Sequence, residues 1–207
     1  RYTEARLAKI AEVGLLAGMK KKNVEFTLNY DETTDEPITL PAIFPNLLCN
    51  PNTGIGVAMA CNWLPHNLKE VAQAIYDYMD GNEVTLPGPD FPTGAIVEGI
   101  NGIKDAFKTG RGKLIVTSKC EFVKNKGKDQ IVITEIPFEV NKQLLVRKID
   151  DIRYDKKIEG ISEVRDESDK DSTIRIVIDL KAGADKELIL KYLLKNTELQ
   201  TTYNYNM

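Results

Sequence analysis

The sequence predicts an α+β fold, most clearly over residues 112–207, and two observations support that prediction. Four short apolar segments have the composition of strands, and two longer segments repeat apolar residues every three or four positions, as amphipathic helices do. In chain order they read strand, strand, helix, strand, strand, helix, which favours a ferredoxin-like sandwich. The predicted strands are 114–116, 131–133, 161–165 and 174–180, the helices are 141–154 and 185–195, and a last extended piece covers 198–204.

The first thirty residues predict a helix followed by a strand. Leu7, Ile10 and Leu15 recur at helical spacing, which indicates a helix over 3–18 that stops near Gly18. Alternating apolar and polar residues over 24–28 then predict a strand, followed by an acidic loop over 31–37.

Residues 40–67 contain four prolines, so we expect this stretch to be mostly irregular. Within it, Gly54 and Gly56 flank Ile55, which predicts a backbone that something can approach closely and an isoleucine at a tip. A dinucleotide-binding loop would need a third glycine where Met59 stands, so that alternative is rejected.

Two more helices are expected before residue 112. Asn67 is a plausible N-cap for a helix that runs to about residue 80, and a short helix covers about 101–108. A proline-rich connector, 87–94, separates them.

Composition excludes several classes of protein. The chain has 207 residues, of which 42% are hydrophobic and 29% charged, and it contains no run of eighteen apolar residues that could span a membrane. The cysteines, Cys49, Cys61 and Cys120, form no CxxC pair, and the single histidine, His66, is interpreted as structural, so no zinc site is predicted.

The net charge of −3 conceals two basic stretches. Residues 1–30 carry six Lys or Arg against three Glu, and residues 104–128 carry eight against two acids. Phosphate contacts should use these stretches, although such runs are also common on solvated faces without a partner.

Short motifs along the whole chain resemble those of the A subunits of bacterial type IIA DNA topoisomerases, DNA gyrase and topoisomerase IV. The resemblance begins with Arg1-Tyr2-Thr3-Glu4-Ala5-Arg6 and extends to the last residues. The motifs are Phe44-Pro45-Asn46-Leu47-Leu48, Thr53-Gly54-Ile55-Gly56-Val57-Ala58-Met59-Ala60, Pro65-His66-Asn67-Leu68, Pro87-Gly88-Pro89-Asp90-Phe91-Pro92-Thr93-Gly94, Thr109-Gly110-Arg111-Gly112, Thr134-Glu135-Ile136-Pro137-Phe138, Lys157-Ile158-Glu159-Gly160-Ile161-Ser162 and Leu199-Gln200-Thr201-Thr202-Tyr203.

The resemblance implies the chemistry of two sites. Tyr2 falls on the family's nucleophile, which joins covalently to a 5′ DNA phosphate, and Arg1 falls on the neighbouring arginine. A free phenol has a pKa of about 10, so a permanent positive charge beside it is chemically reasonable. Ile55 falls on the isoleucine that wedges between base pairs and bends the duplex.

Further phosphate contacts are expected from basic side chains. Arg111, held between Gly110 and Gly112, should present its side chain and nearby N–H groups, with Lys113 close by. The basic turn of Lys20, Lys21 and Lys22 is a weaker candidate for the same role.

The resemblance also implies an architecture and a set of partners. Residues 1–30 would be the C-terminal part of a winged-helix DNA gate, 31–111 an irregular α/β tower segment with the wedge, and 112–207 a ferredoxin-like tower subdomain. The chain is expected to be a fragment, inactive alone, of an A-subunit homodimer that joins two B subunits in an A2B2 enzyme. The partner B subunit would hold Mg²⁺ and hydrolyse ATP, so no metal site is expected in this chain, and the enzyme would act on double-stranded DNA in the bacterial cytoplasm, at the nucleoid, with no membrane contact.

Two alternatives from other classes stay open at this point. A ferredoxin-like RNA reader would stack bases on sheet aromatics, but the strands within 112–136 and 161–180 offer only Phe122. A purely structural scaffold would tolerate replacement of Tyr2.

Overall fold

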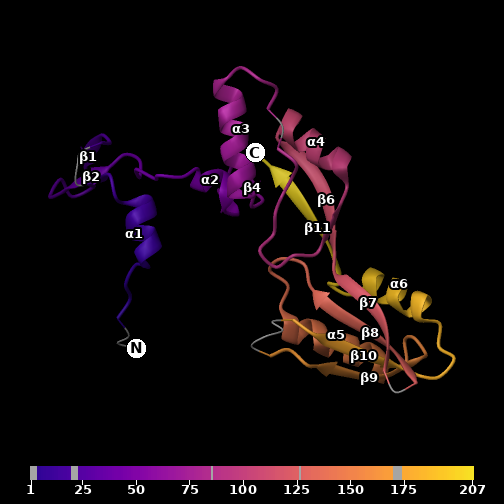
Figure 1. The fold of residues 1–207 in the computed structure, drawn as a ribbon. Coiled ribbons are helices and arrows are strands. Elements are labelled where there is room, and N and C mark those ends of the chain that lie inside the picture. Colours follow the sequence, from indigo (N-terminus) through magenta and orange to yellow (C-terminus); the bar gives the residue numbers. More distant parts are fainter. Residues whose placement is uncertain (1–3, 20–22, 85, 126, 170–173) are drawn as a thin grey trace. The chain divides into compact units, whose positions relative to one another are not determined.

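The computed structural model describes residues 4–19, 23–84, 86–125, 127–169 and 174–207 (Figure 1). The chain forms two compact units, each with its own internal contacts. The first comprises residues 1–51 and 66–87, and the second comprises 52–65 and 88–207. The structure is α+β, as predicted, with antiparallel sheets throughout the described parts. No helix in those parts is both long and apolar enough to cross a bilayer.

The first unit has little regular structure. Helix α1 covers Lys9–Leu15, shorter than the predicted 3–18, and strand β1, Phe26–Leu28, pairs antiparallel with β2, Asp35–Pro37. The sequence indicated only an acidic loop where β2 lies. Helix α2 is a single turn, Asn46–Cys49, and α3 covers Leu68–Met79.

The predicted cap of α3 is present. The Asn67 side chain accepts a hydrogen bond from the backbone N–H of Lys69 at 2.9 Å, which satisfies one of the unpaired donors at the helix start. His66, one residue earlier, is buried, and its Nδ1 lies 3.2 Å from the carbonyl oxygen of Leu48. Because a carbonyl only accepts, Nδ1 carries the proton, and the histidine joins α2 to the start of α3.

The second unit contains two sheets. The five-stranded sheet has the order β3-β4-β11-β6-β5, and the four-stranded sheet has the order β7-β8-β10-β9. The strands of the first are β3 Asn52–Ile55, β4 Ala60–Trp63, β5 Ile96–Glu98, β6 Arg111–Thr117 and β11 Gln200–Asn206. Those of the second are β7 Lys119–Asn125, β8 Lys128–Glu135, β9 Ile161–Asp166 and β10 Ile176–Leu180. The remaining helices are α4 Ile100–Thr109, α5 Lys142–Tyr154 and α6 Lys186–Asn196.

The strand pairing differs from the prediction at one place. The sequence predicted 114–116 and 131–133 as successive strands of one sandwich, but 114–116 belongs to β6, which pairs with β11 in the other sheet. The partner of 131–133 is β7, which follows β6 after the single residue Ser118. Apolar alternation gives no sign of this change of sheet, because both strands share the same period.

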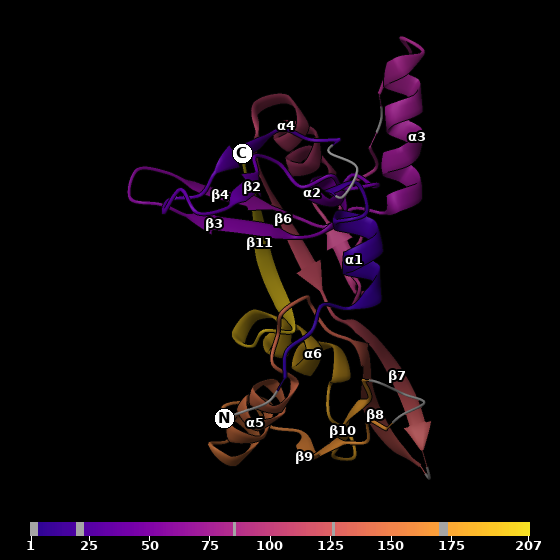
Figure 2. The ribbon, with the colours of Figure 1, turned by 90° about the vertical axis from the view of Figure 1, so that its left-hand side faces the viewer.

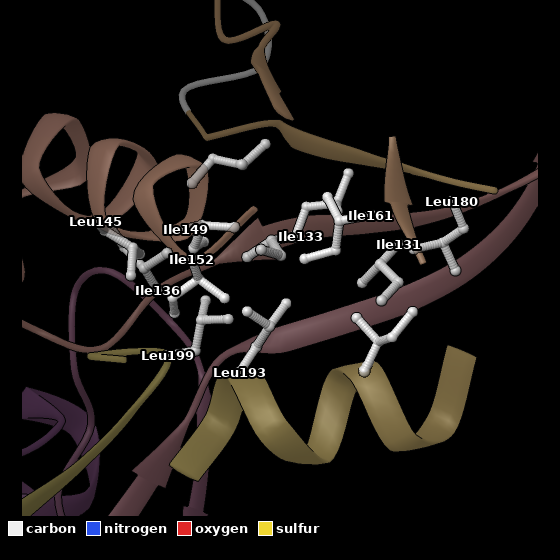
Figure 3. Close-up of a cluster of buried hydrophobic side chains, with 13 residues drawn as sticks. Ile131, Ile133, Ile136, Leu145, Ile149, Ile152, Ile161, Leu180, Leu193 and Leu199 are labelled. Atoms are coloured by element: carbon white, nitrogen blue, oxygen red, sulfur yellow. The ribbon is translucent and has the colours of Figure 1, made fainter. Parts of the chain in front are cut away.

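The core of the four-stranded sheet lies on one face, beneath both helices α5 and α6 (Figure 3). Alternate residues of β8 and β10 point to this face, as the two-residue period of a strand requires. Each fully buried isoleucine or leucine contributes about 1.5–3 kcal/mol through removal from water. The core residues with at most 1% exposure are Ile131, Ile133, Leu145, Ile149, Ile176, Ile178, Ile189, Leu193 and Leu199.

The opposite face of this sheet is held by an ionic network. Asp179 is only 7% exposed, and its carboxylate accepts from Gln130 Nε2 at 2.5 Å and from the Arg165 guanidinium. The hydrogen bond to Asp179, with further bonds to Glu167, raises the pKa of Arg165 above its ordinary value. A buried carboxylate is tolerated here because its oxygens are paired.

Candidate nucleic-acid interface

A two-stranded hairpin projects from the five-stranded sheet (Figure 2). Strands β3 and β4 pair from Asn52↔Trp63 to Ile55↔Ala60, and the turn is closed by a 2.8 Å hydrogen bond from Gly56 N to Met59 O. The sequence predicted irregular structure here, because prolines elsewhere in the stretch obscured the short strands. The structure places Ile55 at the end of β3, next to the turn.

The tip of this hairpin is apolar and exposed. Ile55 is 86% exposed, and Val57 and Met59 in the turn are also exposed. Single apolar side chains on a surface are ordinary, but three together on a projecting turn are typical of a contact site.

The two glycines beside Ile55 are not required by the fold. A Cβ built on Gly54 would meet no atom within 4 Å, and one on Gly56 would meet only Met59 O, at 3.4 Å. Neither glycine has a positive φ. The hairpin therefore keeps open space around its backbone that the chain itself does not fill.

Side-chain amides fasten the hairpin to the rest of the sheet. Strand β4 pairs with β11 through Asn62↔Asn206. Asn62 Nδ2 donates to the carbonyl of Asn204 at 2.7 Å, and Asn206 Nδ2 donates to the carbonyl of Ala60 at 2.5 Å. Thr53 Oγ1 in turn donates to Asn62 Oδ1 at 3.1 Å. These bonds fix the direction in which the tip points.

One face of the five-stranded sheet is polar, and α6 meets it only near Gln200 and Thr202; we call it the open face. Directly paired residues of antiparallel strands share a face, so the register defines its members. Asn206 pairs with both Asn62 and Arg111, which extends the face from the hairpin across β11 to β6. Its residues are Thr53, Ile55, Ala60, Asn62, Asn206, Asn204, Thr202, Gln200, Arg111, Lys113, Ile115, Thr117, Ile96 and Glu98.

The other face of this sheet packs against α4. Leu114, Val116 and Tyr205 are at most 2% exposed. Trp63, Phe107 and Tyr205 form an aromatic cluster, with ring centroids 5.2 Å apart for Trp63–Tyr205 and 6.1 Å for Phe107–Tyr205. This cluster joins the helix to β4 and β11, so only the open face remains for a partner.

The charge of the open face is positive. Arg111 and Lys113 point from β6, both are exposed, and neither forms an ion pair within the described ranges. Glu98, on the edge strand β5, is the one carboxylate among the residues of the open face, and its Oε1 lies 3.4 Å from Thr117 Oγ1.

The predicted role of the glycines around Arg111 was partly wrong. We expected nearby N–H groups to be free for a phosphate, but Gly110 N donates to Ala106 O at 2.8 Å and Arg111 N donates to Thr109 Oγ1 at 3.3 Å. Gly110 instead ends α4 in the left-handed conformation, with φ 77°. The Arg111 side chain is exposed and remains available for a ligand.

The structure brings Ile55, Arg111 and Lys113 onto one sheet face. The other predicted site residues, Arg1, Tyr2, Lys20, Lys21 and Lys22, lie outside the described residues. Sequence reasoning missed the polar side chains of β11, although their signal was present. Polar and aromatic residues alternate over 202–206, and the polar set faces outward.

The acidic run 166–169 is engaged within the protein. Burial opposes ionisation of Asp166, but hydrogen bonds from Ser168 and Lys142 outweigh it and lower its pKa. Glu167 accepts from Arg165 at 3.2 Å and from Arg175 at 3.3 Å. Among the described residues, no group of three or more His, Cys, Asp or Glu side chains is arranged to hold a metal ion.

Phe122 does not suit the RNA-binding alternative. It pairs with Ile131, so it lies on the face covered by the helices, and Lys186 Nζ of α6 lies 5.1 Å from its ring centroid. A stacking platform needs an aromatic ring on an open sheet face.

Fold and surface together define an α+β segment with a cationic sheet face and a projecting apolar hairpin. Comparison with known families is specific: the family model for the A subunit of DNA gyrase/topoisomerase IV matches residues 1–207, so the chain belongs to that family. It is 52% identical to the A subunit of DNA topoisomerase 4 from Bacillus subtilis (strain 168) and 53% identical to that of Streptococcus pneumoniae serotype 4. The protein of the same name from Staphylococcus epidermidis is 50% identical. Each comparison covers the whole of this chain but only 26–27% of the relative, so the chain spans about a quarter of the length of these relatives.

Proposed function

We propose that this chain is the part of a type II topoisomerase A subunit that holds a DNA duplex and cuts one of its strands. The open face is the observation that carries the proposal. Its register puts Arg111 and Lys113, two cations with no ion pair among the described residues, on the same surface as the apolar tip at Ile55. Cations neutralise phosphates without reading sequence, and an apolar wedge unstacks a base step for a few kcal/mol and permits a bend.

Tyr2 is the proposed nucleophile for strand cleavage. Its phenol oxygen attacks the phosphorus, the new ester joins the tyrosine to the 5′ phosphate, and the bond from phosphorus to the 3′ oxygen breaks. The 3′ oxygen leaves with a proton, and the reverse attack reseals the strand with no net loss of ester bonds. Arg1, beside the tyrosine, would neutralise charge on the phosphoryl oxygens, because positioning and charge neutralisation dominate phosphoryl transfer.

The proposal includes partners beyond this chain. Two A subunits would cut the two strands, and the B subunits would hydrolyse ATP in an A2B2 enzyme of the bacterial cytoplasm that acts at the nucleoid. Among the described residues, the acids of the 166–169 run are already paired, and no group of His, Cys, Asp or Glu is arranged to hold a metal ion. In this proposal, carboxylates of the B subunit would hold Mg²⁺, which would polarise phosphoryl oxygens.

A trapped-cleavage assay tests the catalytic part. The full-length A subunit that contains this chain is mixed with its B subunit, Mg²⁺ and supercoiled plasmid, and the reaction is stopped with detergent. We expect protein-linked linear DNA from the native enzyme and none from Tyr2→Phe, which lacks the attacking oxygen. Equal cleavage by both would remove Tyr2 from the reaction. Duplex binding by Tyr2→Phe is the control and should be unchanged.

A further inference from the structure

A hollow lies where the open face meets helix α6. It has a volume of about 480 Å³. Residues of strands β6 and β11 and of helix α6 line it: Ile115, Lys191, Leu194, Lys195, Gln200 and Thr202. Three of these residues, Ile115, Gln200 and Thr202, belong to the open face by register. The hollow is therefore continuous with the surface that carries Arg111.

The hollow is cationic. Lys191 and Lys195 are one helical turn apart, so their side chains emerge from the same side of α6. Both are exposed, neither forms an ion pair within the described ranges, and no carboxylate is among the lining residues. The positive charge of Lys195, in the last turn, also interacts favourably with the helix dipole. Lys191 lies too far from the helix end for the dipole to explain the presence of both lysines.

The spacing suits the backbone of a duplex. Gln200 and Asn206 are six residues apart on β11, and at about 3.3 Å per residue the open face runs about 20 Å between them. Arg111 pairs with Asn206 at one end, whereas the hollow lies at the Gln200 end. Phosphates of one strand follow each other every 3.4 Å or so along the duplex axis, so this distance corresponds to about six base pairs.

The side chains between the two ends suit the same ligand. Thr202 and Asn204 are exposed and carry hydrogen-bonding groups of the kind that contact phosphate and sugar oxygens. Glu98, the one acid of the open face, lies on the edge strand β5 rather than along β11. A polyanion laid along β11 would meet cations at both ends and amide or hydroxyl groups between them.

We infer that Lys191 and Lys195 form a second phosphate-binding site for the duplex that Arg111 and Lys113 contact, about six base pairs farther along it. The inference rests on the proposed function, because it assumes that the open face binds DNA. It makes α6 part of the DNA-binding surface and extends the protected length of the duplex.

Salt-dependent binding of the full-length protein to a fluorescent duplex tests this site. Each lysine removed should lower the slope of log K against log salt by about one, so Lys191→Gln/Lys195→Gln should lower it by about two. The matched control is Lys104→Gln/Lys108→Gln, which makes the same charge change at the same spacing on exposed positions of α4. Helix α4 packs on the sheet face opposite the open face. The control should leave the slope unchanged, and Lys191→Arg/Lys195→Arg should retain it.

A hydroxyl-radical footprint of the bound duplex distinguishes a failure of the second phosphate-binding site from a failure of the proposed function. The α6 variant should lose protection at the outer end of the site and keep it at the centre. If Arg111→Gln/Lys113→Gln weakens binding but the α6 variant matches the native slope and footprint, the second site is wrong and the proposed function stands. If neither variant changes duplex binding, the open face is not a DNA surface and both fall. The inference would also be overturned if the α6 variant lost binding of an acidic peptide but kept the native affinity for the duplex.

Discussion

Tyr203 shows how one half-buried side chain couples stability to alkaline pH. Its hydroxyl donates to the carbonyl of Phe138, and its ring lies 5.3 Å from that of Phe91. Burial, helped by the nearby charge of Glu139, raises its pKa to about 12. The raised value means that folding favours the protonated phenol, so this stabilisation is complete below pH 10 or so, the ordinary pKa, and is lost as pH rises towards 12.

We therefore predict a pH-dependent effect of Tyr203→Phe. Urea denaturation should show the native chain more stable than the variant at pH 8, by about 1 kcal/mol for the lost hydrogen bond, with the difference shrinking between pH 10 and 12. Tyr154→Phe, at a side chain that is 82% exposed, is the control. A difference that stays constant over this range would contradict the proposed coupling.

At the scale of single elements, α4 and β6 are joined by close backbone contact. A Cβ on Gly112 would lie 2.0 Å from Gly102 O and 2.8 Å from the Ala106 Cβ. Because the obstacles are backbone and a short side chain, neither can move aside. Gly112→Ala should lower the free energy of unfolding by about 3 kcal/mol, at the upper end of overpacking effects. Gly54→Ala, whose Cβ meets open space, should change it by less than about 0.5 kcal/mol. Equal denaturation midpoints for the two variants would refute this account.

The hairpin gives a prediction of a different kind, about DNA shape. Ile55→Ala removes most of the proposed wedge but leaves the Asn62 and Asn206 hydrogen bonds that hold the hairpin. Bending of a duplex labelled at both ends, measured by energy transfer with the full-length protein, should decrease while the thermal midpoint stays unchanged. Leu144→Ala, at an exposed apolar residue of α5, is the control. An unchanged bend would rule out Ile55 as the wedge.

Elements whose signals are local were predictable, and pairings between distant segments were not. Asn67, Asn141 and Asp185 each accept a backbone N–H at a helix start, so short-range chemistry identified α3, α5 and α6 to within about a residue. The pairing of β6 with β11 joins residues more than eighty positions apart, and no local pattern encodes it. The open face depends on that pairing, which is why Arg111 and Lys113 were predicted singly but Thr202 and Asn204 were missed.

For the molecule as a whole, net charge is a poor guide to what the surface can bind. The chain carries 28 basic and 31 acidic side chains, for a net −3, yet the open face with its α6 extension presents four cations against Glu98. Many of the acids are used internally, as in the pairs Lys142–Asp166, Lys148–Glu198 and Arg165–Asp179. Such segregation favours binding of a polyanion at this surface.

The link between the two sheets of the second unit has a mechanical consequence. The chain crosses from one sheet to the other at Ser118, between β6 and β7, and returns after α6 through residues 197–199. The two crossings lie side by side, because Ser118 N donates to Leu199 O at 2.8 Å, and both residues are buried. A single strand would act as a swivel, whereas two adjacent strands resist torsion and leave bending as the softer motion. A force applied to the hairpin would therefore displace α6 mainly by bending the link between the sheets, and only slightly by twisting it.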